Sequence, residues 1–168
     1  MPKQSKQLQD MFHDALKDLY FAEKKILVAL PKMAKAAQHE ELKAAFEKHE
    51  TETEKQVERL EQVFALIDED PRGKTCPAIL GIVEEGQEII KEYKGSPAID
   101  AGLIGAAQSV EHYEIARYGT LCAWAEELGF KDAVPLLEAT LDEEKKTDVS
   151  LSQLAETFVN QDAEARAA

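Results

Sequence analysis

The chain has 168 residues and carries 33 acidic against 20 basic side chains, for a formal net charge of −13. This acidity disfavours binding to nucleic acid or to an anionic membrane surface, since both attract basic patches. The length suits one domain over residues 1–168. Two cysteines are too few for a disulfide framework, the start has no apolar segment of signal-peptide type, and no run approaches the ~20 apolar residues of a membrane helix. We therefore expect a cytoplasmic protein.

Apolar residues recur with helical periodicity in five segments, and no segment alternates as a strand would. The predicted helices cover approximately residues 5–37, 40–68, 77–93, 97–128 and 131–158. Ser5 and Ser96 are the expected N-caps of the first and fourth helices, and Pro31 is expected to kink the first or free a carbonyl. Gly129 suits the left-handed position that ends the fourth helix, whereas the polar tail 159–168 is expected to fray.

Four of these helices are long, at about 28–33 residues each, and the third is short. Tight connections after the first and fourth helices imply two antiparallel pairs, with the third helix in the crossover between them. We therefore predict an all-α, ferritin-like four-helix bundle over about residues 5–158, with a short extra helix in the crossover. An open helical array without a central site is the alternative.

Polar side chains interrupt the apolar stripe of each long helix near its middle. Glu23 lies three residues from both Tyr20 and Ile26, so it points to the predicted core. The same spacing places further polar residues on the buried faces of the second, fourth and fifth helices: His49, Glu52 and Gln56; Glu111 and either Glu114 or Ile115; and Glu144 and Asp148.

A buried cluster of carboxylates repels itself unless cations neutralise it or protons remain bound. Two divalent ions would balance four carboxylates, and oxygen ligands with an occasional imidazole suit iron or manganese. The pattern therefore predicts a dinuclear metal site in the bundle core. Any single glutamate of this kind could instead be partly exposed or paired with a basic group.

Eight short segments carry a resemblance to a known family. They cover residues 18–24, 29–34, 49–53, 56–60, 107–116, 118–121, 140–145 and 147–148. Across these segments the chain resembles the YciE/YciF-type ferritin-like proteins, a bacterial family associated with stress and stationary phase. The resemblance implies a ferritin-like bundle, a dinuclear metal centre and a homodimer.

The wider ferritin-like pattern takes one glutamate from each of two helices and a Glu-x-x-His pair from each of the other two. The single glutamates correspond to Glu23 and Glu111, and the paired glutamates to Glu52 and Glu144, although neither of the latter has a histidine three residues later. The candidates to complete the ligand set are His49, Gln56, Glu114 and Asp148.

We expect this site to hold two divalent ions, iron first and manganese second, and to meet a small oxidant such as oxygen or peroxide. Such a site would allow Fe(II) oxidation or peroxide removal, although the sequence does not decide whether the protein is an enzyme. The alternative is a non-enzymatic structural stress protein whose metal site is degenerate and whose buried carboxylates have raised pKa values. A closed ferritin-type storage shell is a third alternative, disfavoured by the implied dimer.

Three tyrosines and one histidine lie close in sequence to the candidate ligands. Tyr20, Tyr113 and Tyr118 either donate hydrogen bonds to ligand carboxylates or pack as ordinary core aromatics. His112 follows Glu111 in sequence and lies about 100° away around the helix, so we do not expect it on the metal face.

Overall fold

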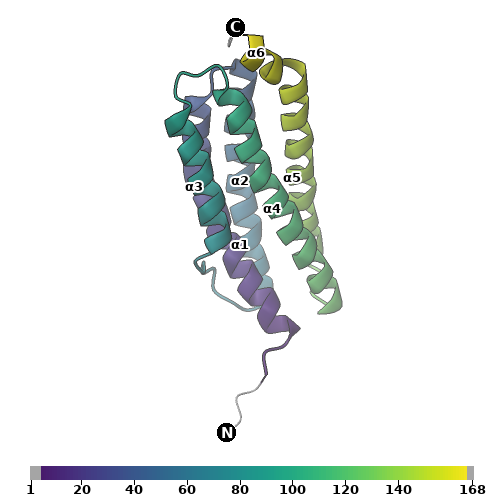
Figure 1. The fold of residues 1–168 in the computed structure, drawn as a ribbon. Coiled ribbons are helices and arrows are strands. Elements are labelled where there is room, and N and C mark those ends of the chain that lie inside the picture. Colours follow the sequence, from purple (N-terminus) through teal and green to yellow (C-terminus); the bar gives the residue numbers. More distant parts are fainter. Residues whose placement is uncertain (1–4, 166–168) are drawn as a thin grey trace.

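The computed structural model describes residues 5–165, and within that range the chain forms helices and no strand (Figure 1). The helices are α1 (Leu8–Ala36), α2 (Glu40–Leu66), α3 (Pro77–Glu92), α4 (Ile99–Glu127), α5 (Val134–Leu154) and α6 (Asn160–Ala165), with a π-helical segment, Ala155–Val159, before α6. None of the helices in this range is long and apolar enough to cross a membrane.

The four long helices form one bundle of two antiparallel pairs (Figure 1). α1 packs along α2 and α4 packs along α5, while contacts between α1 and α4 and between α2 and α5 close the bundle. α3 lies outside, against α1 and α4, and carries the chain back along the bundle to the start of α4. This arrangement confirms the predicted ferritin-like four-helix bundle with an extra helix in the crossover.

The bundle core consists of two apolar regions separated by a polar layer. Towards the start of α1, Phe12, Leu16 and Leu19 are fully buried, and the ring of Phe12 lies 5.4 Å from that of Phe130. Towards the end of α1, Leu30 packs in the same core as Leu103, which is also fully buried. Because the helices are antiparallel, their polar midpoints fall at the same level, between these two regions.

The start of α1 differs from the prediction. The helix begins at Leu8 and not after Ser5, because the Gln7 N–H donates to the Asp10 carboxylate at 2.8 Å and forms a capping box. The helix then continues through Pro31 to Ala36 without ending at the proline.

The start of α4 also differs from the prediction. Ser96 and Pro97 belong to a turn in which the Ser96 hydroxyl accepts a hydrogen bond from the Ala98 N–H at 3.2 Å, and α4 begins at Ile99. The Asp100 carboxylate of its first turn accepts the backbone N–H groups of Gln38 and His39, each at 2.8 Å, and so caps α2 from a neighbouring helix.

Helical structure extends beyond Phe158, where we expected a polar tail. The π-helical segment turns Val159 into the core, where it is 2% exposed, and stacks the Phe158 ring on His39 at 5.5 Å. These contacts anchor α6, which runs to Ala165, and the rest of the expected tail, residues 166–168, lies outside the described residues.

Gly129 ends α4 as predicted, with φ +75°. The Gly129 N–H donates to the Glu126 carbonyl and the Phe130 N–H donates to the Ala125 carbonyl, the two bonds of a Schellman motif. We expect Gly129→Ala to lower the free energy of unfolding by about 1 kcal/mol, because a Cβ disfavours this backbone conformation. Denaturant unfolding measures the change.

The matched control is Gly119→Ala in the same helix, where an added Cβ meets no atom within 4 Å. That variant should gain roughly 1 kcal/mol from helix propensity. Equal effects of the two substitutions would show that the left-handed position does not limit stability.

Candidate metal centre

The polar layer at mid-bundle takes side chains from all four long helices. Glu23 from α1, Glu114 from α4 and Glu144 from α5 are fully buried, and Glu111 from α4 and His49 from α2 are 1% and 3% exposed. Each of them continues an apolar stripe, so the packing that buries the stripe also draws the polar group inward. Such burial of five ionisable groups is costly unless they compensate one another.

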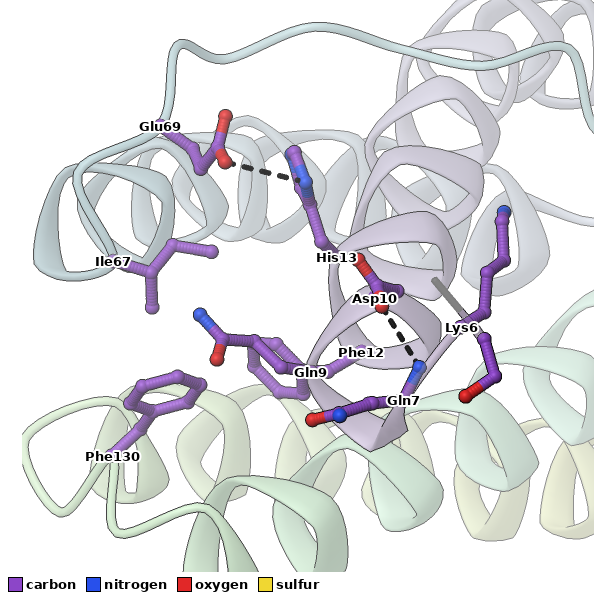
Figure 2. Close-up of a pocket in the computed structure, with 10 residues that line it drawn as sticks. Lys6, Gln7, Gln9, Asp10, Phe12, His13, Ile67, Glu69 and Phe130 are labelled. Carbon is purple, nitrogen blue, oxygen red and sulfur yellow. Dashed lines mark hydrogen bonds and ion pairs between the residues drawn. The ribbon is translucent and has the colours of Figure 1, made fainter. Parts of the chain in front are cut away.

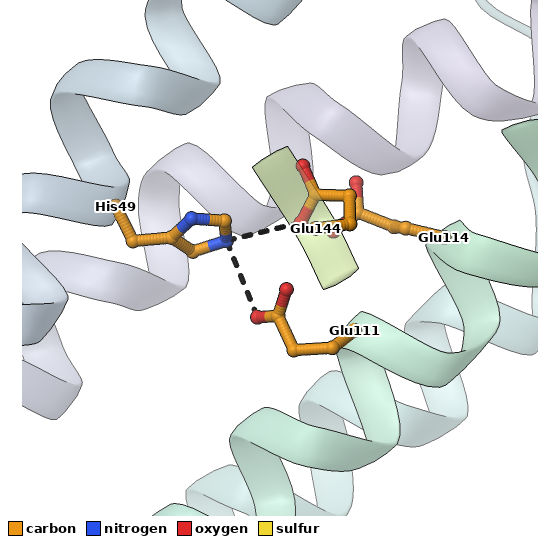
Figure 3. Close-up of side chains that lie close together, drawn as sticks. All are labelled: His49, Glu111, Glu114 and Glu144. Carbon is orange, nitrogen blue, oxygen red and sulfur yellow. Dashed lines mark ion pairs between the residues drawn. The ribbon is translucent and has the colours of Figure 1, made fainter. Parts of the chain in front are cut away.

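The centre of this layer is a cluster of His49, Glu111, Glu114 and Glu144, each of which offers one potential ligand atom within 4.8 Å of the others (Figure 3). The Nε2 atom of His49 lies 3.3 Å from a Glu111 oxygen and 3.7 Å from a Glu144 oxygen. We call these four residues together with Glu23 the acidic layer.

Glu23 joins the cluster from α1, and Tyr118 holds it there. The Tyr118 hydroxyl donates a hydrogen bond to one Glu23 oxygen. Burial raises the pKa of Glu23 to about 7, although the Tyr118 hydrogen bond acts in the opposite direction. Of the three tyrosines considered above, only Tyr118 bonds to the acidic layer, since Tyr20 donates to Glu61 and Tyr113 contacts Cys76.

Desolvation dominates the electrostatics of the acidic layer. Burial raises the pKa values of Glu114 and Glu144 well above the ordinary range, and repulsion from neighbouring carboxylates adds to the rise. Burial alone would lower the pKa of His49, but its interactions with Glu111 and Glu52 outweigh this and raise it well above 6.5. Without a cation, the layer therefore retains protons on glutamates and on the imidazole.

The acidic layer also contains buried atoms that lack hydrogen-bond partners among residues 5–165. They are Glu23 Oε2, both ring nitrogens of His49, Glu111 Oε2, both carboxylate oxygens of Glu114 and Glu144 Oε2. Each of the carboxylate oxygens costs about 1–3 kcal/mol when left unpaired, whereas the two His49 nitrogens keep ion-pair contacts with Glu111 and Glu52. Carboxylate oxygens with one imidazole are donors that iron and manganese accept, so these residues fit a divalent metal.

Gln56 and Glu52 lie at the edge of the acidic layer. The Gln56 amide donates to Glu144 and, at 3.2 Å, to Glu143. The Glu52 side chain is 21% exposed and lies 3.8 Å from His49 Nδ1 and 3.0 Å from Lys48. The interaction with His49, helped by Lys48, lowers the pKa of Glu52 to about 2.

Asp148 lies outside the acidic layer. Its carboxylate accepts a hydrogen bond from Gln108 at 3.0 Å and lies 3.3 Å from His112 Nε2. The His112 side chain is 70% exposed, as expected for a residue off the metal face. The structure thus brings together Glu23, His49, Glu111, Glu114 and Glu144, puts Gln56 and Glu52 at their edge, and pairs Asp148 elsewhere.

Sequence reasoning did not identify a supporting ion pair beside the cluster. The Arg59 guanidinium binds both oxygens of Glu143, at 2.6 and 2.7 Å, and donates to the Thr140 hydroxyl at 3.2 Å. Burial acts to raise the pKa of Glu143, but the hydrogen bonds from Arg59 and Gln56 outweigh it and keep that pKa below its ordinary value. A charged Glu143 helps to hold the Gln56 amide beside Glu144.

A separate pocket of about 400 Å³ lies at the start of α1 (Figure 2). His13 points to Glu69 across it, with 3.5 Å between Nδ1 and the nearer oxygen, and the rings of Phe12 and Phe130 lie at its edge. None of its lining residues belongs to the acidic layer.

Comparisons with known proteins identify relatives of the whole chain. Residues 7–164 match a domain of unknown function, DUF892. The chain is 45% identical to Protein YciF of Escherichia coli K12 over 96% of its own length and 98% of that protein.

Solved structures give the same result. The crystal structure of the E. coli stress protein YciF matches with a TM-score of 0.88 at 44% identity, covering 93% of this chain and 99% of that one. YcfI of Rhodopseudomonas palustris, described as a candidate structural protein, matches with a TM-score of 0.85 at 44% identity, covering 90% of this chain and 97% of that one. A Xanthomonas campestris protein, XCC3681, shares the fold with a TM-score of 0.74 at 23% identity, covering 96% of this chain and 100% of that one. The chain therefore belongs to the YciE/YciF-type family of ferritin-like stress proteins, whose domain carries the description DUF892.

Proposed function

We propose that this protein is a stress-response metal-binding protein that holds two divalent ions, iron or manganese, in the acidic layer. The observation that carries the proposal is the set of buried carboxylate and imidazole atoms without partners among residues 5–165. Divalent cations would satisfy these atoms and remove the repulsion between the carboxylates.

His49, Glu111, Glu114 and Glu144 surround one position, where each offers a ligand atom within 4.8 Å of the others. Glu23 adds a further carboxylate from α1, where it interacts with Glu114 and Tyr118. The Tyr118 hydroxyl fixes one oxygen of Glu23 and the Gln56 amide fixes one oxygen of Glu144, so each carboxylate keeps its other oxygen for a cation. The apolar regions on either side of the acidic layer exclude water.

Bound iron or manganese would supply redox and Lewis-acid chemistry towards oxygen or peroxide, so Fe(II) oxidation and peroxide removal are the activities that we propose. The Tyr118 hydroxyl and the Gln56 amide orient two of the carboxylates through hydrogen bonds.

Elemental analysis tests the proposal on protein purified without a metal-affinity tag and loaded anaerobically with Fe(II) or Mn(II). We expect about two ions per chain in the wild type and a loss of at least one in Glu144→Gln, because a neutral amide is a weak ligand for these metals. The control is Glu138→Gln, which alters an exposed residue of the same helix. Failure of the wild type to bind metal, or full retention by Glu144→Gln, would contradict the assignment.

A structural stress protein with a degenerate site is the second candidate. The hydrogen bonds from Tyr118 and Gln56 favour it, because they hold two carboxylates without any metal. The melting temperature separates the two candidates. It should rise on addition of Fe(II) or Mn(II) if the layer binds metal, and it should be insensitive to both ions if the role is structural.

We also propose that the protein acts as a cytoplasmic homodimer. Cys76 and Cys122 are buried free thiols, which suits a reducing compartment. Large apolar side chains such as Val28 and Val149 are 59% and 55% exposed and supply surface that a partner copy would cover. Analytical ultracentrifugation distinguishes a dimer from a monomer or a large shell.

A further inference from the structure

A groove lies on the outside of the bundle, where α3 packs against α1 and α4. It has a volume of about 540 Å³ and is rimmed by four lysines: Lys32 and Lys35 of α1, Lys91 in the last turn of α3, and Lys94 in the turn that follows α3. No acidic side chain of the described residues lines it. We call it the lysine groove.

Some lysines of the described residues form ion pairs, such as Lys43 with Glu40 at 2.6 Å, whereas others, such as Lys55 and Lys145, form none. The four groove lysines are distinguished by their gathering around one groove that no acidic side chain of residues 5–165 lines. Within residues 5–165, none of the four groove lysines has a carboxylate oxygen within 4.0 Å of its ammonium nitrogen. In a molecule of net charge −13, this patch is a local positive site whose charges are free to meet an anion.

The floor of the lysine groove is apolar. Ile90 and Ile99 line it, and a neighbouring narrow cavity of about 20 Å³ shares Ile90 and is also lined by Met33, Val83 and Val110. An apolar floor beneath a positive rim is complementary to a molecule with an alkyl chain and an anionic head.

We propose that the lysine groove binds a fatty acid, with its carboxylate at the lysines and its alkyl chain along Ile90 and Ile99. The volume lies in the range of roughly 300–1,000 Å³ typical of small-molecule sites. A second copy of the chain fits poorly, because a two-fold dimer through this face would bring lysines against lysines. An anionic bilayer fits poorly as well, because the rest of the molecule is strongly acidic. No lining residue belongs to the acidic layer, so this site does not depend on metal binding.

Calorimetric titration of the full chain with laurate below its critical micelle concentration tests the proposal. We expect saturable binding to one site, with affinity that falls as salt rises. Shortening the chain to decanoate should weaken binding by about fourfold per methylene group removed, because each buried methylene contributes to the hydrophobic term.

Two groove variants and one control complete the experiment. Lys91→Gln with Lys94→Gln, both on exposed residues, should raise Kd by roughly fivefold. Ile90→Asp should abolish measurable binding, since it adds a negative charge to the apolar floor, and circular dichroism checks that it still folds. Lys145→Gln with Lys146→Gln removes the same charge from exposed positions on α5 and should leave Kd unchanged.

Three results would overturn the proposal. The first is no laurate binding by the wild type. The second is an equal loss of affinity in the control and groove variants, which would reflect net charge alone. The third is binding to phosphatidylglycerol vesicles without binding to monomeric laurate, which would identify the surface as a membrane contact instead.

Discussion

Glu23→Gln is expected to stabilise the metal-free protein above pH 7 and to weaken its metal binding at the same time. The carboxylate of Glu23 is fully buried, and burial raises its pKa from 4.5 to about 7. At pH 8 the folded protein must hold this group ionised, at a cost of about 3 kcal/mol relative to the unfolded chain. A glutamine removes that cost and still accepts the Tyr118 hydrogen bond.

Urea unfolding with a chelator present measures the first effect, and Fe(II) or Mn(II) titration measures the second. We expect a gain of up to about 3 kcal/mol at pH 8 and little change near pH 4, where Glu23 is largely protonated in both the folded and the unfolded state. The control is Glu61→Gln, because Glu61 also accepts a tyrosine hydrogen bond, at 2.7 Å from Tyr20, but is exposed. Destabilisation of the metal-free protein by Glu23→Gln at pH 8 would show that the ionised carboxylate is already well compensated.

The helical periodicity was sufficient to predict the bundle because each buried stripe repeats within its own helix. The ends of the helices depend on partners elsewhere. Asp100 caps α2 from the start of α4, and Val159 holds the C-terminal helical segment by entering the core. Asp100 lies 62 positions from Gln38 and 61 positions from His39, the two residues whose N–H groups it accepts, so no local motif reveals this cap.

The sequence could also predict that polar groups meet at mid-bundle, but not their order around the centre. His49 and Glu52 share one broad stripe of α2, and the rotation of that helix in the bundle decides that His49 is 3% exposed and Glu52 is at the edge. Asp148 follows Glu144 by one turn, yet its side chain bonds to Gln108. The Arg59–Glu143 pair joins residues 84 positions apart, which individually resemble ordinary surface charges.

The second large effect concerns pH. We expect the metal-free protein to be most stable near pH 5 and to lose about 3 kcal/mol or more by pH 8, on the strength of Glu23 alone. A carboxyl whose pKa is raised by folding contributes stability that is present below its unfolded value of 4.5 and lost as pH rises through about 7. The raised pKa values of Glu114, Glu144 and His49 act in the same direction.

At low pH the free energy of unfolding falls again, because a second carboxylate then loses its ion pair. The pKa of Glu52 is lowered to about 2, so the stability that it contributes is lost as pH falls below its ordinary value of 4.5. Urea unfolding in chelator from pH 4 to 8 should therefore give a maximum in the free energy of unfolding near pH 5. Glu23→Gln should reduce the fall in that free energy above pH 5.

Bound metal should reverse the pH dependence above pH 5, so that the free energy of unfolding rises with pH and no longer falls. Cations bind the deprotonated carboxylates and the neutral imidazole, so metal affinity rises with pH across the same interval in which the metal-free protein weakens. With Fe(II) under anaerobic conditions or with Mn(II) in excess, stability should increase from pH 5 to pH 7. Parallel pH profiles with metal and with chelator would contradict a cation site in the acidic layer. Opposite slopes would tie the destabilising burial of Glu23, Glu114 and Glu144 directly to metal binding, because the same ionised groups would oppose folding alone and favour it with the cation.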